Sequence, residues 1–162
     1  MTDRLTRARR SWLMSRIPGK DTLPELRVRR LLHCLGYRYR LHVAALPGKP
    51  DIVFPARRKI VWVNGCFWHG HFCKRTKMPK SRRAFWDAKI ATNRRRDRAL
   101  RARLRRLGWT GLTVWECQTK DEAKLARRLA AFLGHAGAPA TRTRSPAGSG
   151  ALRRSARGRR RA

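Results

Sequence analysis

The chain has 162 residues, of which 42 are lysine or arginine and 9 are acidic, so its formal net charge is +33. An imbalance of this size predicts a polyanionic partner such as nucleic acid, because basic side chains bind phosphates and release counterions. No apolar run approaches the roughly 20 residues that a membrane-spanning helix requires, and no signal peptide is recognisable. The sequence therefore argues against a secreted or membrane protein, and we expect a cytoplasmic one with no membrane partner.

Composition divides the chain into three parts. Residues 1–20 are rich in arginine and form a basic N-terminal arm, and residues 21–137 have the size and apolar content of one ordinary domain. Residues 138–162 are almost entirely Ala, Pro, Gly, Ser, Thr and Arg, with too few apolar side chains to offset the entropy of ordering them. We expect a single folded domain between the arm and a disordered basic tail.

The first predicted element is a helix that begins at Thr22 and ends at Gly36. Thr22 and Glu25 have the spacing of a capping box, and an apolar stripe of leucines follows. Residues 37–43 then alternate apolar and basic side chains, which is the period of a half-buried strand.

Later segments predict two short buried strands at residues 51–54 and 60–63 and a long polar helix at residues 82–107. A further strand is expected at residues 112–115 and an amphipathic helix at residues 121–133. This order indicates an α/β fold, a mixed central sheet flanked by helices, with chemistry at the strand ends.

Residues 63–73, with the sequence VNGCFWHGHFC, combine metal ligands, a candidate general base and two adjacent large aromatic residues. About one strand length earlier lies Asp51, the only carboxylate between Glu25 and Asp87. A lone acid on a strand beside a His/Cys loop, in so basic a chain, predicts metal-dependent cleavage of a phosphodiester.

Several blocks of the sequence, with the spacing between them, resemble the very short patch repair endonucleases over about residues 10–135. The blocks are Leu46-Pro-Gly-Lys-Pro-Asp51, Gly65-Cys-Phe-Trp-His-Gly-His71, Cys73, Phe85-Trp86, Arg96-Asp97, Leu107-Gly-Trp109 and Val114-Trp-Glu-Cys117. The resemblance implies a restriction-endonuclease-like fold with a structural zinc loop. It also implies an enzyme that nicks DNA beside the thymine of a T:G mismatch, the product of deaminating a methylated cytosine.

Asp51 is the expected ligand of a catalytic Mg²⁺, because a carboxylate at a strand end holds a cation that stabilises charge on the phosphate. An ordinary turn aspartate is the alternative. The resemblance implies that the backbone carbonyl of Val63 is a further ligand. His69 is the expected general base, since imidazole titrates near neutral pH, and the alternative is a zinc ligand.

Two further polar residues are assigned to the same site. Asn64 stands where the best-known family members carry histidine, and an amide can bond a phosphate oxygen but exchanges no proton at neutral pH. Glu25 is either a helix cap or, as the resemblance implies, an acid near the active site that holds water or the histidine. Asn93 and Asp97 share one face of the long helix and match the resembling family, and the alternative is that they only pair with arginines.

Cys66, His71 and Cys73 have the spacing of metal ligands in a short loop, and Cys117 at the end of a later strand can complete a Cys₃His zinc set. The loop has almost no aliphatic residues to pack, so a structural Zn²⁺ would replace the missing core. Cys34, near the end of a helix, is expected to be a small buried residue.

Phe67 and Trp68 lie in the middle of this loop, where a short extended segment cannot turn both side chains inward. We expect them, with Trp86 on the following helix, to act as a wedge that unstacks base pairs, and core packing is the alternative for each.

The sequence therefore predicts a Mg²⁺-dependent, zinc-stabilised endonuclease that nicks double-stranded DNA at a T:G mismatch. It is expected to act as a monomer, with mismatch-repair proteins as further partners. Two alternatives remain at this point: a restriction-like endonuclease that needs no mismatch, and a zinc-containing module that binds DNA without cutting it.

Overall fold

The structure is a computed structural model, and it describes residues 6, 8, 9, 12, 15, 16, 19–74, 76–79 and 81–136. The tail predicted at residues 138–162, and most of the arm predicted at residues 1–20, lie outside these residues. No helix in the described part of the chain combines the length and the apolar character needed to cross a membrane.

A four-stranded sheet in the order β1-β2-β3-β4 forms the centre of the molecule. Its strands are β1 Arg40–Leu41, β2 Ile52–Phe54, β3 Lys59–Asn64 and β4 Thr110–Trp115. The first three strands pair antiparallel, whereas β3 and β4 run parallel. The prediction of a mixed sheet flanked by helices is confirmed.

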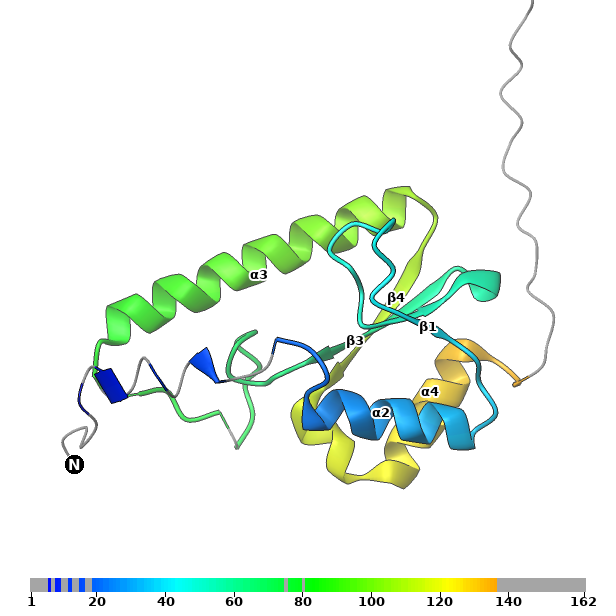
Figure 1. Ribbon diagram of the computed structural model, residues 1–162, viewed down its shortest axis with the longest axis horizontal. Coiled ribbons are helices and arrows are strands. Elements are labelled where there is room, and N and C mark those ends of the chain that lie inside the picture. Colours follow the sequence, from blue (N-terminus) through cyan, green and yellow to red (C-terminus); the bar gives the residue numbers. More distant parts are fainter. Residues whose placement is uncertain are drawn as a thin grey trace, which may run out of the picture.

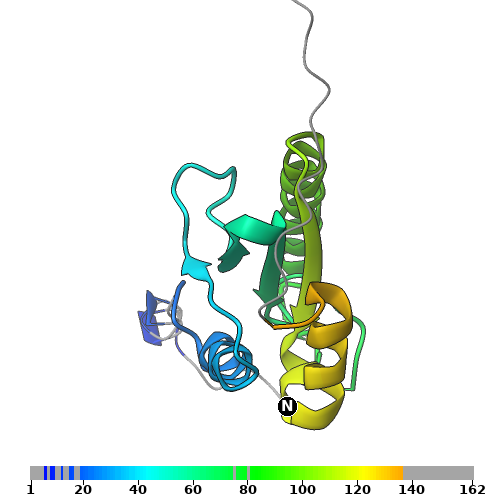
Figure 2. The same cartoon turned by 90° about the vertical axis from the view of Figure 1, so that its right-hand side faces the viewer.

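Helices cover both faces of this sheet (Figure 1). Helix α2, Leu23–Cys34, and helix α4, Glu122–Leu133, lie on one face, and the long helix α3, Arg83–Arg106, lies on the other. The view turned by 90° shows the same separation (Figure 2). Short 3-10 helices follow two of the strands, at Pro55–Arg57 and Glu116–Lys120.

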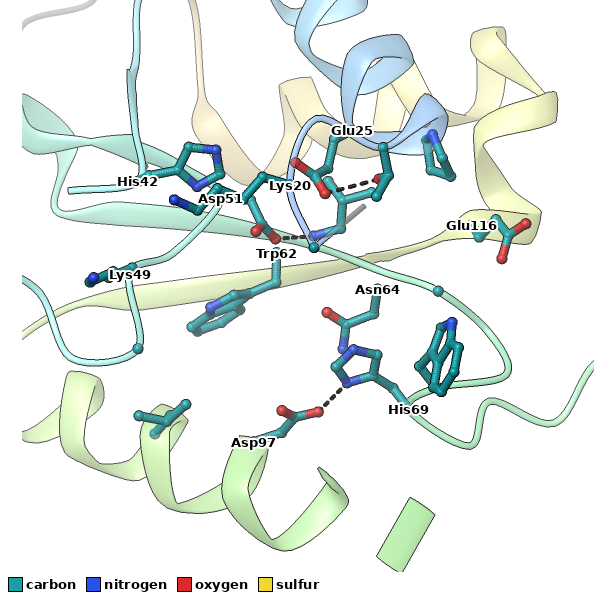
Figure 3. Close-up of a pocket in the computed structure, with 18 of the residues that line it drawn as sticks. Lys20, Glu25, His42, Lys49, Asp51, Trp62, Asn64, His69, Asp97 and Glu116 are labelled. Carbon is teal, nitrogen blue, oxygen red and sulfur yellow. Dashed lines mark hydrogen bonds and ion pairs between the residues drawn. The ribbon is translucent and has the colours of Figure 1, made fainter. Parts of the chain in front are cut away.

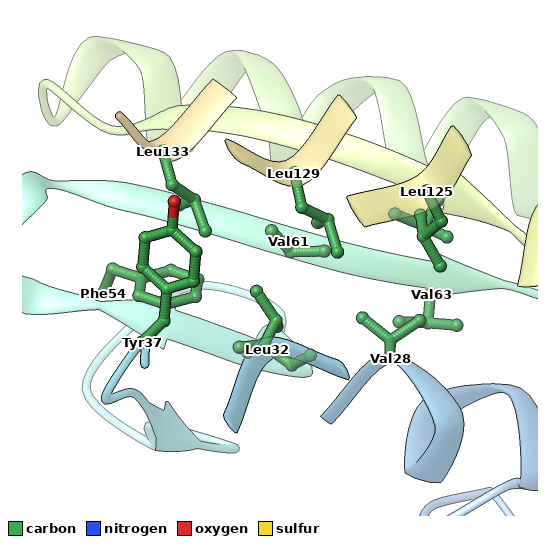
Figure 4. Packing of buried hydrophobic residues seen from close by; sticks show 11 residues of the cluster. Val28, Leu32, Tyr37, Phe54, Val61, Val63, Leu125, Leu129 and Leu133 are labelled. Carbon is green, nitrogen blue, oxygen red and sulfur yellow. The ribbon is translucent and has the colours of Figure 1, made fainter. Parts of the chain in front are cut away.

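The hydrophobic core lies between β2, β3 and β4 and the two helices α2 and α4 (Figure 4). Val61 and Val63 of β3 belong to this core. Because successive residues of a strand face opposite sides, Trp62 and Asn64 are directed to the other face, beneath α3. One strand thus contributes Val61 and Val63 to the core and Trp62 and Asn64 to the α3 side.

The entrance to α2 differs from the predicted capping box. Thr22 is the N-cap, but its hydroxyl donates to Glu25 Oε1 at 2.9 Å and accepts no backbone hydrogen bond of the helix. Glu25 Oε2 accepts the backbone N–H of Asp21 at 3.1 Å. The carboxylate of Glu25 thus bonds the residue before the N-cap and not the backbone of the N-cap itself, and it is buried.

The strand predicted at residues 37–43 is much shorter than expected, because only Arg40 and Leu41 pair with β2. His42 follows with a positive φ of 45°, a conformation that ends the strand. Tyr37 and Tyr39 use their side chains instead, packing edge-on against Phe54 with ring centroids 6.2 and 6.0 Å away. The alternation of apolar and basic residues at positions 37–43 therefore arises from the packing of aromatic side chains and not from a ladder of backbone hydrogen bonds.

Candidate functional site

A cavity of about 800 Å³ lies between the start of α2, the end of β3 and the middle of α3. Its lining includes every residue for which a catalytic or Mg²⁺-binding role is predicted, namely Glu25, Asp51, Val63, Asn64 and His69. Figure 3 shows Glu25 and Asp51 on the α2 side of this pocket and His69 on the α3 side. The fold thus brings together residues that are 44 positions apart at the extremes (69 − 25).

Asp51 immediately precedes β2 and its Oδ2 accepts the backbone N–H of Val63 at 2.8 Å. Burial raises the pKa of the Asp51 carboxyl above its ordinary value, the hydrogen bond from Val63 opposes the rise, and the nearby Glu25 adds to it. A buried carboxylate beside a second acid favours a bound cation, because a positive charge relieves both costs. The side chain thus has the surroundings of a metal ligand.

His69 donates a hydrogen bond from Nδ1 to Oδ2 of Asp97, because a carboxylate oxygen can only accept. Asp97 comes from α3, and the two side chains are only 21% and 17% exposed. A carboxylate in this position fixes the orientation and tautomer of the ring, which leaves Nε2 as the atom for proton transfer. An imidazole oriented in this way can act as a general base.

The alternative considered for Asn93 and Asp97, that they only pair with arginines, is not what the structure shows. Asp97 binds His69, and Asn93 Nδ2 donates to the backbone carbonyl of Trp68 at 2.9 Å. In the sequence, the four-residue spacing of Asn93 and Asp97 indicated only that both lie on one face of the helix. One face of α3 therefore anchors two successive residues of the loop that follows β3.

Asn64 is the last residue of β3 and its side chain is buried at the pocket, near His69 (Figure 3). Lys20 and Lys49 also line the pocket and supply positive charge. The sequence analysis did not identify these two lysines, because nothing in the sequence distinguishes them from the many other basic residues. A polar floor with lysines nearby is suited to a phosphate.

The four predicted zinc ligands also come together. One ligand atom from each of Cys66, His71, Cys73 and Cys117 lies within 4.8 Å of the others, and we call these four residues the metal cluster. The parallel register of β3 and β4 explains part of this arrangement, because Asn64 lies opposite Trp115 at the strand ends. Cys66 and Cys117 each follow two residues later, so the two cysteines leave the sheet side by side. The cluster can hold a metal ion, and His69 is not part of it.

Neighbouring groups hold the metal cluster in place. The ring of His71 stacks on Trp115 with centroids 4.4 Å apart, and Thr76 Oγ1 donates to the carbonyl of His71 at 2.7 Å. Burial raises the pKa of the Cys66 thiol to about 12. A bound cation would reverse this effect, because thiolates and not thiols ligate metals.

Cys34 is exposed, so the prediction of a small buried residue is wrong. The buried face of α2 includes Val28 and Leu32. Cys34 lies two residues beyond Leu32, about 200° around the helix, and so faces solvent. As the sequence predicted, Cys34 is not grouped with the other three cysteines.

Phe67, Trp68 and Trp86, which we call the aromatic cluster, pack edge-to-face with ring centroids 5.2 to 6.1 Å apart. All three rings are half-buried, so they pack on one another and still reach the surface. Trp68 also lines the pocket. Phe72 on the same loop is fully exposed and was not singled out in the sequence.

Comparison with known proteins gives three informative matches. The family described as DNA mismatch endonuclease Vsr matches residues 2–75. The type II nicking enzyme V.XorIIP of Xanthomonas oryzae pv. oryzae is 51% identical, over 80% of this chain and 95% of that protein. The DNA mismatch endonuclease Vsr of Escherichia coli is 42% identical, over 77% of this chain and 80% of that protein.

One solved structure is also similar. The catalytic domain of the homing endonuclease I-Bth0305I has a TM-score of 0.47 and 20% sequence identity, and the match covers 69% of this chain and 94% of that one.

Proposed function

The chain belongs to the Vsr family of DNA endonucleases, and from this premise we propose that it nicks one strand of duplex DNA next to the thymine of a T:G mismatch. The observation that carries the catalytic part is the pocket in which Asp51 lies across from the His69–Asp97 pair. A metal-ligand candidate facing an oriented base is the arrangement required for hydrolysis of a phosphodiester. The mismatch part is supported by the similarity to the Escherichia coli relative, a DNA mismatch endonuclease.

In this mechanism Asp51, with the backbone carbonyl of Val63, would hold Mg²⁺. When bound, this ion supplies Lewis-acid stabilisation of negative charge on the phosphate. His69 takes a proton from the attacking water at Nε2, and Asp97 stabilises the imidazolium that forms. Asn64 donates to a phosphate oxygen and holds the group in line. Water then bonds to phosphorus, the bond to the leaving oxygen breaks, and that oxygen receives a proton from solvent.

We propose that the metal cluster holds a structural Zn²⁺. Three cysteines and one histidine are a common ligand set for structural zinc. The buried Cys66, whose thiol would otherwise stay protonated, fits this ion. Zinc there would fix the loop that carries His69 and the aromatic cluster.

We propose that the aromatic cluster is the wedge that unstacks the mismatched step. Half-buried rings at the edge of the pocket can leave their mutual contacts and insert between bases. A mismatched step is cheaper to unstack than a matched one, so a wedge converts this difference into selectivity.

Nicking of matched and T:G duplexes in the presence and absence of Mg²⁺ tests the proposal. Metal-dependent nicking of the T:G duplex alone is expected. Equal nicking of both duplexes would favour an endonuclease without a mismatch requirement, for which the asparagine at position 64 is the specific argument. Binding without cleavage would favour a DNA-binding module. We further propose that it acts as a cytoplasmic monomer on the genome, with mismatch-repair proteins as partners.

A further inference from the structure

Arg29 of α2 is buried next to the pocket, with a side chain only 9% exposed. Its Nη1 donates to Asp21 Oδ1 at 2.5 Å and its Nη2 donates to Glu25 Oε2 at 2.9 Å. The same Nη2 lies 3.1 Å from Nε2 of His42. A guanidinium has no acceptor, so Nε2 of His42 accepts this hydrogen bond. We call these four residues the Arg29 network.

Without Arg29, the other three members would resemble a cation site. One ligand atom from each of Asp21, Glu25 and His42 lies within 4.8 Å of the others. The guanidinium bonds to all three of these side chains, and the lone pair of His42 that would ligate a metal is engaged. The positive charge of Arg29 also lowers the pKa of Asp21, mainly through their hydrogen bond.

Arg29 does not have the surroundings of a residue kept for stability alone. Its Nε–H is buried and finds no acceptor in the described part of the chain. A buried arginine that is incompletely bonded is a poor contributor to stability compared with an apolar side chain of similar size. Two residues bonded to it, Glu25 and His42, line the pocket with Asp51. These contacts favour a role for Arg29 in the reaction over a role in stability alone.

We propose that Arg29 is a positioning residue that takes the place of a metal ion between Asp21, Glu25 and His42, and so fixes the carboxylate of Glu25 on the pocket wall. The proposal rests on the nuclease function proposed above. Unlike a metal ion, a guanidinium cannot dissociate, and its planar fork sets the direction of each carboxylate. The pocket therefore needs to load one divalent cation fewer than its acidic residues suggest.

Counting bound Mn²⁺ by electron paramagnetic resonance in the zinc-loaded full chain, without DNA, tests the first part. Arg29→Met leaves Asp21 and Glu25 without their cation, so it should bind one Mn²⁺ more than the wild type. Arg29→Lys keeps a cation and should bind the wild-type number. Arg30→Met, an exposed neighbour on α2, is the control. An unchanged count in Arg29→Met overturns the proposal.

A double-mutant cycle tests the second part. Arg29→Met should slow single-turnover nicking about 10- to 100-fold, with DNA affinity unchanged, as loss of an orienting partner does. In a Glu25→Gln background the same change should have little further effect, because Arg29 acts through Glu25. Equal factors in both backgrounds would contradict this.

Arg29→Lys extends the cycle if Arg29→Met folds poorly. It keeps the charge but loses the two-point fork, so its smaller loss of rate should also disappear in the Glu25→Gln background. The two proposals fail separately. If the wild type cuts matched and mismatched DNA alike, the mismatch function is wrong, whereas the Mn²⁺ count still decides the role of Arg29.

Discussion

Asp51 illustrates at the scale of one residue how catalytic and stability requirements oppose each other. Its pKa is raised by burial, so ionising it costs folding free energy. The neutral acid is fully tolerated below the unfolded-state pKa of about 3.9, and this stability is lost as the pH rises through the higher folded-state pKa. At neutral pH the metal-free protein therefore carries a destabilising charge.

We predict that Asp51→Asn abolishes nicking and raises the melting temperature of the Mg²⁺-free protein at pH 7. The amide oxygen can still accept the N–H of Val63, and DNA binding should persist because it rests on basic side chains. Thermal melting at pH 7 and pH 3.5 measures the effect, and the gain should shrink at the lower pH. A variant that nicks DNA at the wild-type rate would remove Asp51 from the mechanism.

His69 and Asp97 form a second residue-scale test. His69→Ala should slow single-turnover nicking about 100- to 10,000-fold, the usual contribution of a general base. Asp97→Asn should cause a smaller loss, because the base remains but its protonated form is less stabilised. Asp87→Asn is the matched control, since Asp87 lies on the same helix and pairs with the exposed Arg83, away from the pocket lining. Equal rates for Asp97→Asn and Asp87→Asn would contradict the assigned pair.

The sequence could identify residues that lie inside short motifs and could not identify those that act across elements. The motif positions drew attention to Asp51 and His69 and to the cysteines, because residue type and local spacing carry that information. The Arg29–His42 contact depends on how α2 is placed against the turn after β1, and no local pattern encodes this. The sequence placed Asp97 on one face of α3 but did not identify it as the partner of His69.

At the scale of the element, we expect metal binding by the metal cluster to order the loop after β3. Cys73→Ala or Cys117→Ala should lose zinc and much of the folding stability, because the loop has almost no aliphatic residues to hold it. Cys34→Ala is the control and should retain both, since Cys34 is exposed and remote from the cluster. Elemental analysis and thermal melting measure the two properties. Zinc-free wild-type protein, freshly purified without chelator, would remove the structural-site proposal.

The aromatic cluster makes a separate prediction about selectivity. Replacing Phe67 and Trp68 together by alanine should reduce the ratio of T:G to matched nicking, because the difference in unstacking cost is no longer used. Titration against both duplexes, with rates measured in parallel, gives this ratio. An equal loss on both substrates would show that these rings serve binding or folding instead.

Element boundaries followed from sequence where the pattern was long and failed where it was short. Helices α3 and α4 and strands β2 to β4 lie where periodicity predicted them. Strand β1 kept only two residues, because His42 adopts a left-handed conformation and the two tyrosines pack through their side chains. A pattern of period two reports which side chains are buried, and aromatic packing alone can produce it.

At the scale of the whole molecule, charge is spread far beyond the pocket. Deleting residues 138–162 should weaken binding to matched and mismatched duplexes alike and reduce the salt dependence of binding, because arginines there would meet phosphates and not base edges. Titrations at several salt concentrations measure the slope. A loss confined to the T:G duplex would instead give this segment a role in recognition, opposite to the signature expected of the aromatic cluster.

The parallel pairing of β3 with β4 limits how this molecule can vary in evolution or by engineering. Asn64 is held opposite Trp115, Val63 in the core and Cys66 two residues beyond. One inserted or deleted residue in β3 would turn Asn64 into the core and Val63 out of it, and would also displace Cys66 from Cys117. Changes of length should be tolerated better at the exposed Ala44 and Ala45, which precede the pocket-lining Gly48 and Lys49, whereas this half of the sheet can diverge only by substitution.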